Sequence, residues 1–197
     1  MTVVVCLAIE PSAVAAQGIE VAPFGGYRFG GGFFELVTRQ PVDLDGAPVL
    51  GVVVDVPLPS GMQVEGLFTH QRADVLLPTP LLDSGSLWRM TVDHWLGGGL
   101  QEFRGGRVRP FLTGTLGLTR YAAAGDSEIR FAVSAGGGVK LFPSPHVGVR
   151  LDGRLFATFV DADATFVACA PGTCILAFHT DVVWQAEFTA GVVFRFR

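Results

Sequence analysis

Residues 179–196 read HTDVVWQAEFTAGVVFRF, and their side chains alternate in character along the chain. The even positions from Val182 to Phe196 are almost wholly apolar, whereas the odd positions carry most of the polar and charged residues. Such alternation is typical of a β-strand whose two faces meet different surroundings. A strand rises roughly 3.3 Å per residue, so Val182–Phe196 is roughly 46 Å long and can cross a ~30 Å hydrocarbon core at a tilt of about 45°.

Seven further segments alternate in the same way, namely 18–29, 50–57, 62–71, 88–101, 107–120, 129–141 and 147–159. The links between the segments differ in length. Short turns are expected at 57–61, 103–106 and 142–145, and longer links at 30–49, 72–87, 121–128 and 160–178. Short and long links then lie at opposite rims, as in outer-membrane barrels. The pattern predicts an all-β fold, an eight-stranded antiparallel up-and-down transmembrane β-barrel over residues 17–197, with external loops and both termini in the periplasm.

The composition supports a membrane protein without transmembrane helices. Hydrophobic residues make up 49% of the chain, charged residues 16%, and the mean hydropathy is +0.45, whereas soluble domains carry about 25% charged residues. No apolar run reaches the roughly 18 residues of a transmembrane helix. A soluble eight-stranded barrel would place its apolar face inside and its charges outside. A water-facing surface is normally rich in charge, and Lys140 is the only lysine, so we favour the membrane barrel.

The first sixteen residues resemble a targeting segment. Residues 3–9 form a short apolar run, and the small residues 13–16 provide a cleavage site before Gln17. The positive residues that usually precede the apolar run are missing, so either the true start lies upstream or the signal is weak. The alternative is an ordinary buried strand over residues 2–9. We expect residues 1–16 to be a signal peptide.

Two cysteines remain after that segment. Cys169 and Cys174 are separated by Ala-Pro-Gly-Thr, and Pro-Gly favours a turn. The two thiols should face each other across a tight loop, and a disulfide would form in an oxidising compartment. The alternatives are two free thiols or half of a metal site. No second cysteine pair and no histidine at ligand spacing accompanies them, so we expect no metal.

The end of the chain carries a motif. Residues 189–196 read TAGVVFRF and resemble the C-terminal β-signal of bacterial outer-membrane proteins. Thr189 matches the polar position, Gly191 the glycine, and Phe194 and Phe196 the two alternating aromatics. The chain continues to Arg197, whereas family members usually end on the aromatic residue. The resemblance implies that the barrel assembly machinery recognises this strand.

The chain from residue 17 is similar to the small bacterial outer-membrane β-barrel domain family, of the OmpX, OmpW and OmpA-barrel kind. The resemblance implies a location in the outer membrane of a Gram-negative cell, with outer-membrane lipid as a partner and no cofactor. The formal net charge of −4 gives no reason to expect nucleic acid as a partner. The oligomeric state stays open.

The polar faces of the strands predict a charged lumen. Its predicted members are Glu20, Arg28, Asp55, Glu65, Arg89, Asp93, Arg109, Arg130, Arg150, Asp152, Arg154, Asp181 and Glu187, and the same face adds Arg107, Lys140 and Arg195. Buried charges must be paired or solvated. We favour a salt-bridge network that fills the narrow lumen over a path for protons or solutes. The facing of His94 and Trp95 stays open, because His94 falls on the apolar face and a β-bulge would exchange them.

Catalytic signals are sparse. His179 and Asp181 share the polar face near the external rim, and Ser84 and Ser86 are the loop hydroxyls that could act with them. Polar residues of a wetted rim explain them better, so we expect no enzyme and no catalytic residues. The leading prediction is a structural or surface-interaction barrel with a mostly plugged polar lumen. The alternative is a narrow pore for small or hydrophobic solutes, and a lipid-modifying enzyme is a distant third.

Overall fold

We describe a computed structural model of the chain. The described residues are 18–34, 41–43, 46–76, 87–103, 106–123, 126–159, 169–170, 173–174 and 182–196. The predicted signal segment 1–16 lies outside them. No helix among these residues has the length and hydropathy needed to cross a bilayer.

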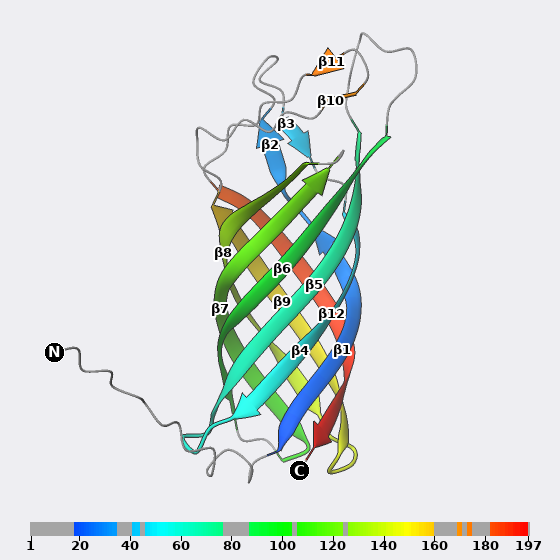
Figure 1. Cartoon of the computed structure of the whole chain (residues 1–197). Helices are drawn as coiled ribbons and strands as arrows, with labels where there is room; N and C mark the ends of the chain where they lie inside the picture. Colours follow the sequence, from blue (N-terminus) through cyan, green and yellow to red (C-terminus); the bar gives the residue numbers. More distant parts are fainter. Residues whose placement is uncertain are drawn as a thin grey trace, which may run out of the picture.

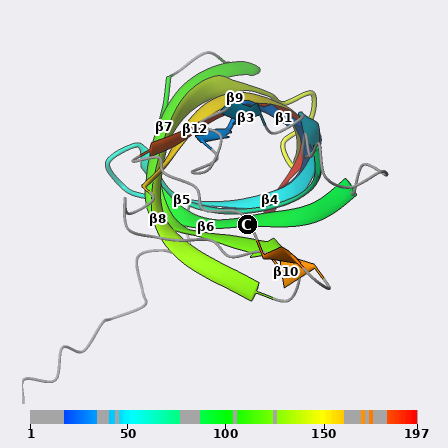
Figure 2. The same ribbon diagram turned by 90° about the horizontal axis from the view of Figure 1, so that it is seen from above.

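Within the described residues, eight long strands close into one antiparallel barrel, in the order β1-β12-β9-β8-β7-β6-β5-β4 with β4 returning to β1 (Figures 1 and 2). Their bounds are β1 Ile19–Phe29, β4 Ala47–Pro57, β5 Met62–Leu76, β6 Leu87–Glu102, β7 Val108–Ala123, β8 Asp126–Leu141, β9 Val147–Phe159 and β12 Val182–Phe196. Closure by β1 and β12 leaves no free edge, so strand backbone groups can pair within the sheet. The eight-stranded, all-β, antiparallel fold predicted from the sequence is confirmed.

Tight turns join the strands at the end where β1 begins and β12 ends (Figure 1). The β4–β5 turn closes through Leu58 N to Met62 O at 2.8 Å, and Gly61 supplies a backbone φ of +86°, which glycine adopts at little cost. The other two short connections lie at the predicted places, between Glu102 and Val108 and between Leu141 and Val147.

The opposite end carries the longer connections, with one exception. Short hairpins lie there, β2 Gly32–Phe34 with β3 Pro41–Asp43, and β10 Cys169–Ala170 with β11 Thr173–Cys174. The predicted long link at 121–128 is wrong. Strand β7 continues to Ala123 and β8 starts at Asp126, because the ladder extends through Tyr121 to Ala123 opposite Asp126 to Glu128.

The two faces of the sheet differ in polarity as predicted for most strands. Trp184, Phe188 and Leu50 expose 63%, 64% and 65% of their surfaces on the outside of the barrel. The charged side chains of β1, β4, β9 and β12 point inward, and most are buried. The barrel is therefore apolar outside and polar inside, the reverse of a soluble barrel.

Strand β6 corrects the prediction. The prediction that Arg89 and Asp93 face the lumen places Leu96 and Leu100 on the outer face. Both leucines are instead buried in the lumen, and Trp95 lies outside with 43% exposure. Pairing with β5 and with β7 runs through this region without a bulge, so the alternation is unbroken and His94 faces inward. The predicted face of β6 was inverted because apolar residues occupy inward positions here.

Candidate functional site: the charged lumen

A lysine anchors the lumen near the short turns. Lys140 on β8 is completely buried, and its ammonium donates to Glu20 Oε2 at 2.7 Å, Asp55 Oδ2 at 2.8 Å and Gln63 Oε1 at 2.9 Å. These three acceptors come from β1, β4 and β5. An ammonium has three donors, so all of them are used. The contact between Lys140 and Asp55 joins opposite walls of the barrel, because β8 and β4 are four strands apart in the closed order.

Arginines surround this lysine at the same rim. Arg195 donates to Glu20 Oε1 from Nε at 2.9 Å and from Nη2 at 2.5 Å. Arg109 Nη1 donates to Glu102 Oε1 at 3.0 Å. The guanidinium carbons of Arg195 and Arg109 lie 4.1 and 5.0 Å from the centre of the Phe142 ring. Paired charges and two cation–π contacts thus pack together at this end of the lumen.

Two arginines of β9 occupy the middle of the lumen. Arg150 donates to Asp55 Oδ2 at 2.8 Å and to Glu65 Oε2 at 2.6 Å. Arg154 Nη1 lies 2.9 Å from Glu65 Oε1, and its Nη2 donates to Asp152 Oδ2 at 2.9 Å. Strands β9 and β5 are opposite each other in the barrel, so the two pairs with Glu65 cross its full width.

Toward the long loops the lumen contains aromatic rings and one further buried ion pair. Arg28 on β1 pairs with its register partner Glu187 on β12 and donates to Thr69 Oγ1 at 2.6 Å. Its guanidinium carbon lies 4.7 Å from the centre of the Phe156 ring. The His94 ring stacks on Phe156 at 4.8 Å, and His94 Nδ1 lies 2.6 Å from Thr119 Oγ1.

The interior charges balance. In the described residues seven inward cations each have a carboxylate within 4.0 Å, and the two sets are Arg28, Arg109, Arg130, Lys140, Arg150, Arg154, Arg195 and Glu20, Asp55, Glu65, Glu102, Glu128, Asp152, Glu187. A low-dielectric interior makes an unpaired charge costly. Chemically, this arrangement holds side chains across the lumen, with carboxylates and cations engaged as mutual counter-ions.

Most of the predicted lumen residues lie where they were expected. Glu20, Arg28, Asp55, Glu65, Arg109, Arg130, Arg150, Asp152, Arg154 and Glu187 face inward, as do Lys140 and Arg195. Two predictions are wrong. Asp93 shares the outer face of β6 with Trp95 and contacts His70, since the alternation of β6 is inverted. Arg107 lies exposed in the β6–β7 turn.

Other sequence predictions fall partly or wholly outside the described residues. The backbone of Arg89 pairs with Asp74 on β5, but its side chain is not among those described. Asp181, His179, Ser84 and Ser86 lie outside the described residues. Cys169 is the register partner of Cys174 in the β10–β11 hairpin, and the disulfide between them stays a prediction.

Glu128 is an inward carboxylate that was missed because it falls in the predicted long link 121–128, which is strand β8 from Asp126 onward. Glu102 is the other inward carboxylate that the sequence analysis missed. It accepts from Arg109 and lies 3.7 Å from Lys140 Nζ. Its place at the end of β6 follows from the facing of Leu100, two residues earlier. A correct facing of β6 would therefore have identified it.

The four residues of the terminal motif lie on β12 where it pairs with β1. Phe194 and Phe196 face outward with 40% and 59% exposure. Gly191 faces Phe24 of β1, and a Cβ at Gly191 would lie 2.6 Å from Pro23 O. The glycine of the motif thus lets the two closing strands meet beside an inward phenylalanine.

No family model matches the sequence, and no curated protein matches it either. Solved structures do match the fold. Neisserial surface protein A has a TM-score of 0.57 at 12% identity, with 91% of this chain and 97% of that chain covered. A major outer membrane protein from Thermus thermophilus has a TM-score of 0.50 at 13% identity, with 92% and 100% covered. The chain therefore has the fold of the small eight-stranded β-barrels of bacterial outer membranes.

Proposed function

We propose that the chain is an integral outer-membrane protein whose barrel serves a structural or surface-interaction role and does not conduct. The observation that carries the proposal is the set of ion pairs between opposite walls, Lys140 with Asp55 and both Arg150 and Arg154 with Glu65. Eight strands enclose a lumen that side chains can fill. Ion pairs that span the full width of the lumen hold opposite walls together and close the lumen.

The outer surface supports the membrane location. Large apolar side chains are exposed on the outside of all eight barrel strands, and such a surface is unfavourable in water. In this arrangement the short turns and both chain ends are periplasmic, and the longer connections face outward to contact partners. The fold shared with Neisserial surface protein A supports the same location. The barrel assembly machinery would insert the chain through the terminal motif of β12.

We propose no catalytic role, because the described lumen carboxylates act as counter-ions for neighbouring cations. A narrow pore is the function that the test must separate from a closed barrel. Both share the same fold, so only transport distinguishes them.

Conductance across a planar lipid bilayer tests the proposal. The wild-type protein should give no steady conductance, because its lumen is bridged. Arg150→Ala removes three contacts in the middle of the lumen and should open a small leak. Arg107→Ala, which removes an exposed arginine of a turn, is the matched control and should stay closed. A stable wild-type channel comparable to a general porin would overturn the closed-lumen proposal.

A further inference from the structure

Among the described side chains, the charged residues on the outside of the barrel are confined to three adjacent strands. The outward positions of β1, β4, β8, β9 and β12 carry no Asp, Glu, Lys, Arg or His in the described residues. Outward positions of β5, β6 and β7 with described side chains carry His70, Arg72, Asp93 and Arg120. All four lie toward the long-loop end. We call them the outer basic cluster.

The register places the cluster in two neighbouring rows. His70, Asp93 and Arg120 are consecutive partners across β5, β6 and β7, and Arg72 lies one row nearer the loops. From strand spacing and rise, the Cα atoms of Arg72 and Arg120 are roughly 12 Å apart. Two arginine side chains can reach a common anion across that distance.

The charges of the cluster are unequally satisfied. His70 Nδ1 lies 2.6 Å from Asp93 Oδ1, and Asp93 is largely buried by its neighbours. Arg72 and Arg120 are exposed, and neither makes an ion pair with a described side chain. The seven lumen cations are all paired, so these two arginines stand out. A guanidinium beside lipid is unfavourable without an anion, and its planar fork fits phosphate.

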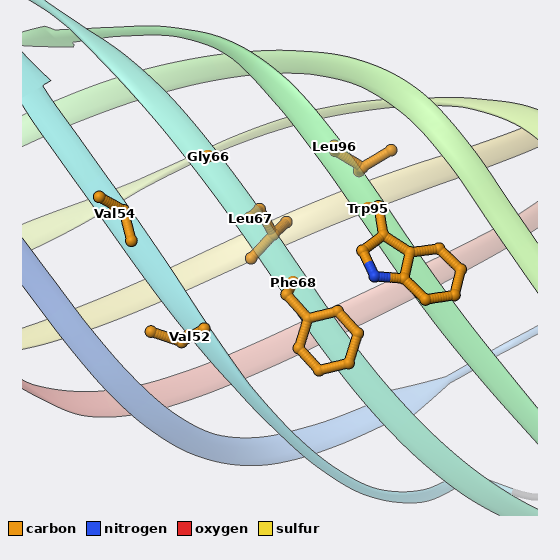
Figure 3. Close-up of a pocket in the computed structure, with 7 residues that line it drawn as sticks. All are labelled: Val52, Val54, Gly66, Leu67, Phe68, Trp95 and Leu96. Atoms are coloured by element: carbon orange, nitrogen blue, oxygen red, sulfur yellow. The ribbon is translucent and has the colours of Figure 1, made fainter.

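An apolar groove continues from the cluster along the same strands. The next row is Phe68 with Trp95, whose rings lie 5.7 Å apart, and the row after that is Gly66 with Gly97. The groove has a volume of about 430 Å³ and is lined by Val52, Val54, Gly66, Phe68 and Trp95 among others (Figure 3). A Cβ at Gly66 would meet only Val54 O, at 3.9 Å, so this glycine leaves space on the outside of the barrel.

We propose that the outer basic cluster and the groove together bind one phosphorylated membrane lipid. Arg72 and Arg120 hold the phosphate of its headgroup, His70 adds a contact beside them, and an acyl chain lies in the groove below. The order along the strands, from charge to aromatic pair to open groove, matches an amphiphile that enters headgroup outermost. The inference rests on the proposed function, because it requires this surface to face lipid.

Lipid binding to the refolded full-length chain in an uncharged detergent tests the proposal, with Kd measured by native mass spectrometry. The probes are lipid A with both phosphates, the same lipid without phosphates, and inorganic phosphate. Wild type should bind the phosphorylated lipid at least tenfold more tightly than the dephosphorylated one. Arg72→Gln with Arg120→Gln should abolish that preference. Arg107→Gln, which removes an arginine at the opposite rim, should keep it.

A matched pair of glycine variants tests the groove separately. Gly66→Leu fills the groove and should weaken the binding of both lipids several-fold. The preference for the phosphorylated lipid should persist. Gly114→Leu makes the same change at an outward glycine with nothing within 4 Å, outside the groove lining, and should change neither Kd. If the double arginine variant does not fold, each single substitution must weaken the preference.

Three results would overturn the proposal. They are equal Kd values for the two lipids, a preference that survives loss of both arginines, and displacement of the lipid by inorganic phosphate at the same concentration, which would indicate a site for the free anion. A Gly66→Leu variant with unchanged affinity would overturn the groove assignment. None of these results depends on conductance. The proposal of a closed lumen and the proposal of a lipid site can therefore be refuted separately.

Discussion

Glu65 is the residue on which the middle of the lumen depends most. Its two oxygens lie 2.6 Å from Arg150 Nη2 and 2.9 Å from Arg154 Nη1, and Thr113 donates to it at 2.7 Å. The side chain is fully buried. Both guanidinium groups therefore share this one buried carboxylate, which they contact in addition to Asp152.

Removal of that charge should be costly. Glu65→Gln leaves two buried guanidinium groups short of a counter-charge, and we expect the free energy of unfolding to fall by about 3–5 kcal/mol. Glu128→Gln is the control, because its pair with Arg130 is partly exposed at the rim, and it should cost below about 1 kcal/mol. Urea unfolding of the refolded protein in lipid bilayers measures both. If both variants lost the same free energy of unfolding, the central ion pairs would stabilise the barrel no more than the pair at the rim.

The space around a barrel glycine depends on whether it faces the lumen or the outside. At Gly138 a Cβ would lie 2.0 Å from Leu151 O and 2.9 Å from the ring of Phe111. At Gly114, on the outer face, nothing lies within 4 Å. Glycine is thus required where an inward ring and a neighbouring strand crowd the backbone, and not where the surface is open.

Alanine substitution separates the two kinds of position. Gly138→Ala should lower the free energy of unfolding by about 1–3 kcal/mol through overpacking. Gly114→Ala should be neutral or stabilising by up to about 1 kcal/mol, since glycine in a strand costs conformational entropy. The same urea titration measures both variants. The reverse order of stability would contradict the assigned faces of β7 and β8.

At the scale of the element, β12 both closes the barrel and presents the terminal motif. Phe194 and Phe196 point outward beside Val21 and Ile19 of β1. The two rings therefore contribute nothing to the lumen network. Their role can be tested without disturbing the interior.

Loss of the two rings should impair insertion. Phe194→Ala with Phe196→Ala should reduce the amount of folded protein in the outer membrane while export continues, because the assembly machinery would read these aromatics. Trp184→Ala with Phe188→Ala removes two outward aromatics of the same strand outside the motif, and should insert more fully. Gel migration of outer-membrane fractions with and without boiling measures the folded amount. Unchanged insertion of the motif variant would refute the role of the signal.

Alternation alone predicts a strand's existence and usually its facing, and β6 shows where it fails. In β12 the charges fall on one face and the aromatics on the other, so the facing follows directly. In β6 the inward positions include Leu96 and Leu100, and the outward ones include Asp93 and Gln101. The two faces of β6 are thus reversed in polarity relative to those of β12. Leu96 packs in the apolar part of the lumen, and Asp93 lies in the outer basic cluster.

The partners inside the lumen could not be predicted, because they depend on the register of strands far apart in sequence. Lys140 and Glu20 are 120 residues apart, and Arg150 and Asp55 are 95 apart. Nothing local to either residue specifies the other. The polar composition of the lumen could be predicted, whereas its pairing and the wall-to-wall direction of the bridges could not.

At the scale of the molecule, the two surfaces of the sheet define the protein. The inner surface pairs its charges across the lumen, and the outer surface exposes apolar side chains on every barrel strand. The central claim is that this outer surface contacts lipid hydrocarbon, while the interior is packed and closed to water.

Spin labels placed one at a time along β12 test that claim most directly. Labels at the outward Trp184, Phe188 and Val192 should collide with dissolved oxygen in preference to a water-soluble nickel chelate, as in hydrocarbon. Labels at the inward Val183, Glu187 and Val193 should be shielded from both, so that accessibility alternates along the strand. Outward positions that the nickel chelate reaches freely would contradict the account, because they would show a barrel whose apolar face meets water.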